Sequence, residues 1–98
     1  MLFDLQVHER DGWTVLSVVG ELDLAAAPRL ADALAAVEDS QAVVVDLAET
    51  TFVDSRGLAT LVAAHHRLGG HLRVVNVRPE VRRVFEITTL DDVLLRDD

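Results

Sequence analysis

The sequence predicts a single α/β domain in which helices pack on a mixed β-sheet. Two apolar segments flank an Asp-Gly turn near the start of the chain. A run of three valines in the middle is typical of a buried strand. Segments with helical spacing then alternate with apolar runs, so the expected order is β-β-α-β-α-β-α, followed by an optional final strand.

Composition indicates one folded domain, residues 1–98. Half of the 98 residues are hydrophobic, which argues against disorder. No apolar run approaches the roughly 20 residues of a membrane span, and residues 1–10 lack the blocks of a secretion signal. The chain has no cysteine, so disulfides and thiolate metal sites are excluded. We therefore expect a cytoplasmic protein that does not attach to a membrane.

Charge restricts the possible partners. The formal net charge is −8, and all nine basic residues are arginines. An acidic surface repels a phosphate backbone, so direct nucleic-acid binding is not expected. Such a surface suits either solubility alone or a basic protein partner.

The first elements are a hairpin and a helix. Residues 3–9 and 13–22 alternate as strands around the Asp11-Gly12 turn, which favours antiparallel pairing. Pro28 is tolerated only near a helix start, so the next helix begins between Ala25 and Ala27. Asp23 precedes this start and can cap its first amides. The apolar stripe of this helix has spacing i, i+4, i+7: Leu30, Leu34 and Val37.

The middle of the chain predicts a central strand and a second helix. Residues 42–47 read as a short strand buried on both faces, and residues 48–54 as its connection to the helix. The helix runs from Ser55 to Leu68 and ends at the Gly69-Gly70 pair.

The last third predicts another strand and helix. Residues 71–77 form the strand, and Pro79 opens the helix. Residues 90–95 form either a short final strand or a helical turn. Strands joined through helices pair in parallel by right-handed crossovers, which makes the sheet mixed.

The segment FVDSRGLATL, residues 52–61, joins the carboxyl side of the central strand to a helix N-terminus. Ligands and partners of open α/β sheets bind at such ends. Helix N-termini carry unpaired amides and about half a positive charge, so they favour anions, phosphate included. Ser55 fits either the N-cap or the first helical position. Gly57 costs roughly 1 kcal/mol of helix stability relative to alanine, which is either tolerated or offset by a gap that lets a partner reach the hydroxyl.

Catalysis by this chain is not expected. A serine nucleophile needs a base within hydrogen-bond reach, whereas His65 lies about 15 Å further along the same predicted helix. DSRGL also lacks the glycine before the serine that a nucleophile elbow requires. His65 and His66 face different sides of the helix, so they do not chelate a metal together. No glycine-rich phosphate loop is present, and we expect neither a metal nor a cofactor.

Two motifs carry a family resemblance. VVGELDLAAAPRL, followed by VVVDLAETTFVDSRGLATLV, resembles the STAS domain and most of all the bacterial anti-anti-sigma factors. Those proteins antagonise anti-sigma factors in sporulation and stress responses. Gly20 to Asp23 and Phe52 to Leu58 match the family's two signature regions. The later VRPEVRRVFEITTLDDVL matches its closing pattern, so the resemblance covers essentially the whole chain.

The resemblance implies a phosphorylation switch at Ser55. The unphosphorylated form would bind and sequester an anti-sigma factor that is itself the serine kinase. Phosphorylation would abolish binding, and a PP2C-type, metal-dependent serine phosphatase would restore it. The implied partner-binding residues cluster around the two motifs: Glu21, Asp23, Asp54, Ser55, Arg56, Gly57 and Leu58.

Physical chemistry gives this switch a mechanism. A phosphoserine adds roughly −1.5 to −2 charges, which the amides of the helix start can hold. Arg56 replaces a serine or threonine common in the family; it pairs with the phosphate or an acidic patch of the partner, or has no role. If Ser55 is not the acceptor, Thr50 and Thr51 are the candidates. The alternative functions are a scaffold STAS module, as in stressosomes and in anion- or lipid-transport complexes, and a ligand-sensing STAS module.

Overall fold

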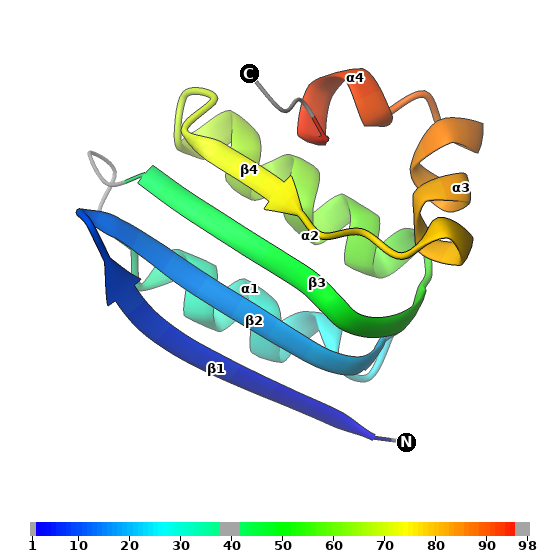
Figure 1. The fold of residues 1–98 in the computed structure, drawn as a ribbon, viewed down its shortest axis with the longest axis horizontal. Coiled ribbons are helices and arrows are strands. Elements are labelled where there is room, and N and C mark those ends of the chain that lie inside the picture. Colours follow the sequence, from blue (N-terminus) through cyan, green and yellow to red (C-terminus); the bar gives the residue numbers. More distant parts are fainter. Residues whose placement is uncertain (1, 38–41, 96–98) are drawn as a thin grey trace.

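Four strands form one sheet in the order β1-β2-β3-β4 (Figure 1). The computed structural model describes residues 2–37 and 42–95. Its strands are β1 Phe3–Arg10, β2 Trp13–Leu22, β3 Ala42–Val53 and β4 Leu72–Val75. Its helices are α1 Ala27–Ala35, α2 Ser55–Arg67, α3 Pro79–Ile87 and α4 Asp91–Leu94. The predicted α/β class and element order are confirmed, and the optional last element is a helical turn.

The hairpin and the parallel crossovers are as predicted. β1 pairs with β2 in antiparallel register, and Arg10 lies opposite Trp13 across the turn. Asp11 and Gly12 have φ of 53° and 85°, the left-handed values that a two-residue hairpin turn requires. β2 pairs with β3, and β3 with β4, in parallel through α1 and α2.

The helices cover one face of the sheet. In Figure 1, α1 and α2 lie behind the strands. Burial alternates along β2 and along the first half of β3, where Val43 and Val45 are buried but Val44 and Asp46 are half-buried. The prediction that residues 42–47 are buried on both faces is therefore wrong, because no described helix covers the second face.

β3 is longer than predicted. Residues 48–53, expected as a connection, continue the strand to Val53. The register of β3 against β2 shifts twice in this stretch, which marks two bulges and explains why the alternation of apolar residues is lost. Threonine hydroxyls fasten the bulged part to β2: Thr50 donates to the Val18 carbonyl at 2.7 Å, and Thr51 donates to the Gly20 carbonyl at 3.4 Å.

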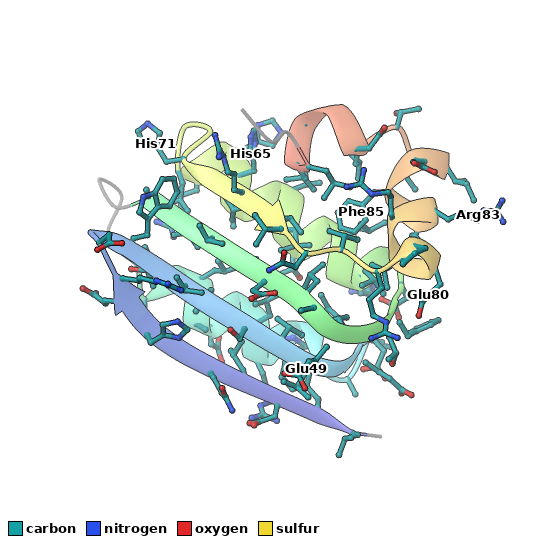
Figure 2. All side chains as sticks on the ribbon, viewed as in Figure 1. Glu49, His65, His71, Glu80, Arg83 and Phe85 are labelled. Atoms are coloured by element: carbon teal, nitrogen blue, oxygen red, sulfur yellow. The ribbon has the colours of Figure 1, made fainter. Side chains whose placement is uncertain are left out.

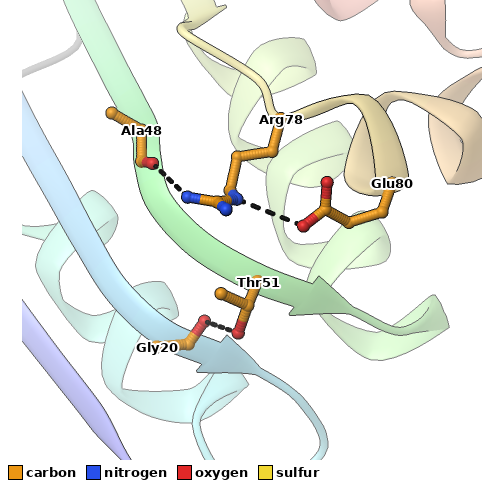
Figure 3. A network of polar contacts seen from close by, with 5 residues as sticks. All are labelled: Gly20, Ala48, Thr51, Arg78 and Glu80. Carbon is orange, nitrogen blue, oxygen red and sulfur yellow. Dashed lines mark hydrogen bonds and ion pairs between the residues drawn. The ribbon is translucent and has the colours of Figure 1, made fainter.

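Arg78 supports the other side of the bulged strand. Its guanidinium donates to the Ala48 carbonyl at 3.5 Å and pairs with Glu80 at 3.1 Å (Figure 3). A backbone hydrogen bond at the start of α3, followed by the contact with Arg78, lowers the pKa of Glu80. The start of α3 is thereby held against β3.

The helix ends follow the predicted signals. α1 begins at Ala27, within the predicted range, and α2 is followed by Gly69 and Gly70 with φ of 62° and 87°. Arg67, the last residue of α2, donates to the Leu34 carbonyl at 2.6 Å and caps the C-terminal end of α1.

Candidate functional site

Asp54 fixes the start of α2. It is the N-cap, and its Oδ1 accepts hydrogen bonds from the amides of Arg56 at 3.0 Å and Gly57 at 3.1 Å. Its own amide donates to the Leu22 carbonyl at 3.2 Å, so the cap is also tied to the end of β2. The helix start is thus anchored to the sheet by one residue.

Ser55 is the first residue of α2, one of the two positions that the sequence allowed. Its side chain is exposed. Within residues 2–37 and 42–95, its hydroxyl forms no hydrogen bond, because the capping role belongs to Asp54. An exposed hydroxyl without an internal partner is open to chemistry from outside the molecule.

The amides at the helix start are already engaged. The sequence suggested that they could hold a phosphate on Ser55, yet the Asp54 carboxylate accepts two of them. A phosphate could reach those amides only by displacing this carboxylate. The helix start therefore offers a phosphate fewer open amides than the sequence analysis assumed.

Gly57 has a different role from the predicted gap. The residue is buried, and a Cβ placed on it would lie 2.7 Å from Leu22 Cγ and 2.8 Å from the Leu22 carbonyl oxygen. Both distances are shorter than a carbon side chain tolerates. The glycine lets α2 approach the end of β2, and the space beside it is filled by this chain itself.

The two signature regions meet at one end of the sheet. Leu22 and Val53 are paired at the ends of β2 and β3, so Asp23 and Asp54 follow neighbouring strand ends. Asp23 is buried, and its Oδ1 accepts from the Ala26 amide at 3.0 Å, which shapes the turn before α1. The structure thus brings together the segments that carry the predicted partner-binding residues.

Exposure divides the predicted partner-binding residues into two groups. Ser55 and Arg56 are exposed, and Glu21 and Asp54 are partly exposed. The others are buried: Asp23, Gly57 and Leu58. The buried residues could affect a partner only by positioning the exposed ones.

Three large apolar side chains missed by the sequence analysis are exposed: Leu24 and Phe52 belong to the two motif segments, and Ile87 precedes Thr88, which borders a hollow together with Ser55. Leu24, Phe52 and Ile87 are 61%, 48% and 74% exposed. We call Leu24, Phe52, Ser55, Arg56 and Ile87 together the serine-end surface. The sequence did contain a signal for the exposure of two of them. Leu24 follows an aspartate that forms a turn, and Phe52 is adjacent to the apolar Val53, so only one of these two neighbours can face the core.

Two hollows border α2. One, of about 500 Å³, lies between α1 and α2, and half of its lining residues are alanines, with Leu24 and Arg56 among the others. The other, of about 410 Å³, is bounded by Ser55, Thr88 and Leu90 among others. Small side chains of α2 leave room on both sides of the helix for a partner.

Two of the four histidines are on α2, far from Ser55 along the helix. His65 and His66 are in its last turn, whereas Ser55 is its first residue. Figure 2 shows His65 and His71 together at one corner, away from Glu80. Among the residues that the structure describes, no three metal-ligating side chains come together.

Comparison with known proteins decides the family. The sequence model of the STAS domain matches residues 4–97. The chain belongs to the STAS domain family. This STAS domain is 31% identical over 100 residues to an anti-sigma-B factor antagonist of Listeria monocytogenes, covering 96% of this chain and 88% of that protein.

Two mycobacterial proteins are also similar to this STAS domain. The anti-sigma-F factor antagonist RsfB of Mycobacterium tuberculosis is 34% identical over 89 residues, which cover 87% of this chain and 73% of that protein. The crystal structure of an anti-sigma factor antagonist from Mycobacterium paratuberculosis superposes with a TM-score of 0.85 at 38% identity. That match covers 95% of this chain and 83% of the other. In the described part of this STAS domain, no helix is long and apolar enough to cross a membrane.

Proposed function

We propose that this STAS domain is an anti-sigma factor antagonist whose binding is switched by phosphorylation of Ser55. The observation that carries the proposal is the exposed hydroxyl of Ser55 on an anchored helix start. Support comes from the family and from relatives named as antagonists of anti-sigma factors, with which this chain shares about a third of its residues.

The partner in this proposal is an anti-sigma factor with serine-kinase activity. Ser55 Oγ attacks the γ-phosphorus of ATP held by that kinase. The new O–P bond forms as the bond to the bridging oxygen breaks, ADP leaves, and the hydroxyl proton passes to a base of the kinase. A PP2C-type serine phosphatase hydrolyses the phosphoserine and regenerates the binding form.

The serine-end surface is the proposed docking site. Exposed apolar side chains are favourable contacts once a partner buries them: Leu24, Phe52 and Ile87. Arg56 stands among them, and its guanidinium pairs with no carboxylate of the described chain. It therefore suits an acidic group of the partner, despite the net negative charge of the molecule.

Phosphorylation acts directly at this interface. Because Asp54 occupies the nearby amides, the phosphate remains on the outside, next to a carboxylate. A partner shaped around a neutral hydroxyl then faces a bulky dianion. A loss of about 3 kcal/mol weakens the affinity roughly a hundredfold, without a large conformational change.

Three variants test the proposal. Ser55→Ala should bind the anti-sigma factor whether or not ATP is present, and Ser55→Asp should bind at least tenfold more weakly, as titration calorimetry measures. Thr60→Ala is the matched control, because its hydroxyl is on the same helix but donates to the Arg56 carbonyl at 3.0 Å. It should be phosphorylated and should bind as the wild type does.

Intact mass spectrometry identifies the acceptor. After incubation with ATP and the kinase, wild type should gain one phosphate and Ser55→Ala none. If Ser55→Ala still gains a phosphate, the assignment is wrong. Thr51 would then be the better remaining candidate, because Thr50 is buried and its hydroxyl is bonded.

A further inference from the structure

The edge strand β1 lacks several of the features that usually prevent an edge strand from pairing, although it carries three charged residues. It lies at one end of the strand order, with β2 on its inner side (Figure 1). It runs for eight residues in unbroken register and contains neither proline nor lysine. Natural edge strands are usually short, bulged, covered or carry such residues. Val7 is 57% exposed at its middle.

The backbone of β1 offers an alternating set of free groups. The Leu2 carbonyl accepts from the Glu21 amide at 3.0 Å, so even-numbered residues turn their backbone towards β2. The amide of Leu5 points away from β2 and donates to the side chain of Asp4 at 2.9 Å, a bond that a pairing strand would have to replace. Odd-numbered residues, Val7 among them, therefore turn their N–H and C=O groups to the outside.

The side chains of β1 are self-complementary in one register. If a second copy pairs antiparallel about Val7, its Val7 lies opposite the first. Asp4 then faces Arg10 of the other copy, and Gln6 faces His8. The same pairs repeat by symmetry, so the interface holds two ion pairs.

Alternative registers lose this match. Centring the pair on Gln6 or on His8 separates Asp4 from Arg10. Both charged side chains project from the sheet face that α1 and α2 leave uncovered, since they pair with half-buried positions of β2. Within the described residues Arg10 has no carboxylate partner that it would have to give up. Charge thus selects one register.

We propose that β1 pairs with β1 of a second copy, antiparallel about Val7, and joins two four-stranded sheets into one. The occupant of this edge is another molecule of the same chain because the pattern complements itself. The dimer involves neither Ser55 nor a sigma-system partner, so its test is independent of the proposed function.

Sedimentation velocity of the purified full chain, up to about 500 µM, measures the dimer. Arg10→Asp sets two like-charge pairs in place of two ion pairs and should weaken dimerisation at least about tenfold. Asp4→Arg should do the same. The double variant Asp4→Arg, Arg10→Asp restores opposite charges and should return the dissociation constant to within about threefold of wild type.

Matched controls separate this register from net charge. Arg83→Asp and Glu86→Arg make the same charge changes at exposed positions of α3 and should leave dimerisation unchanged. Val7→Pro removes an outward N–H that the monomer does not use. The variant should therefore remain folded by circular dichroism and sediment as a monomer. A wild-type chain that stays monomeric overturns the proposal. So does a dimer that still forms with Val7→Pro, or a double variant that dimerises no better than the single charge variants.

Discussion

Replacing Gly57 with alanine tests whether the glycine is needed for α2 to pack closely against the end of β2. On helix propensity alone, Gly57→Ala should stabilise the protein by about 1 kcal/mol. The new Cβ would instead lie 2.7 Å from Leu22 Cγ and 2.8 Å from the Leu22 carbonyl oxygen. A flexible side chain can move aside, but this carbonyl belongs to the sheet and accepts from the Asp54 amide.

The two contributions have opposite signs, which makes the outcome decisive. Overpacking typically costs about 1–3 kcal/mol, and the propensity gain of about 1 kcal/mol offsets part of it, so the net loss of unfolding free energy should be up to about 2 kcal/mol. For a domain of this size, that lowers Tm by up to roughly 15 °C. In a Leu22→Ala background the loss should shrink but persist, because the carbonyl remains.

Urea and thermal unfolding followed by circular dichroism measure the effect. Ala59→Gly is the matched control, because Ala59 is exposed on the same helix and its replacement should cost about 1 kcal/mol by propensity alone. A Gly57→Ala variant that melts above wild type would refute the packing explanation. It would also reopen the possibility that the glycine serves an external partner.

Three further changes test contacts that hold the site. Asp54→Ala removes the cap of α2 and should cost about 1 kcal/mol in urea unfolding, whereas an unchanged midpoint would mean that water replaces the cap. Thr50→Val removes a buried hydrogen bond and should cost about 1 kcal/mol, and Thr51→Val, whose bond is long and part-buried, should stay within about 0.5 kcal/mol; equal effects would contradict this ranking. Arg67→Ala should lower Tm by several degrees through loss of the charge-assisted bond to the Leu34 carbonyl, with Arg67→Met testing whether the aliphatic stem alone suffices.

Periodicity was sufficient to predict most elements. Helical spacing predicted the helices. Two start signals, Pro28 and Pro79, and one stop signal, the Gly69-Gly70 pair, placed their ends close to the observed ones. β3 was underestimated because its two bulges interrupt the alternation on which strand prediction depends. The polar residues that fill the bulged stretch looked like a connecting loop.

Local sequence could not decide the roles at the helix start. Asp54 and Ser55 are both good N-cap residues, and only the backbone conformation shows that Asp54 takes the position. The reason for Gly57 depends on Leu22, a residue on another strand, so no local pattern reveals it. The prediction that the two motifs lie at one end of the sheet follows from parallel pairing alone, because the carboxyl ends of parallel strands converge there.

If Ser55 is phosphorylated as proposed, the Asp54 cap determines how strongly that phosphorylation is linked to the folding equilibrium. A group attached to an outward-pointing oxygen, with the neighbouring amides already satisfied, gains few intramolecular contacts in the native state. Native and denatured chains would then accept the phosphoryl group with similar free energy, and its thermodynamic linkage to unfolding would be weak. Phosphorylation and dephosphorylation would then leave the free energy of unfolding nearly unchanged. Binding activity could be switched without changing how long the protein persists in the cell.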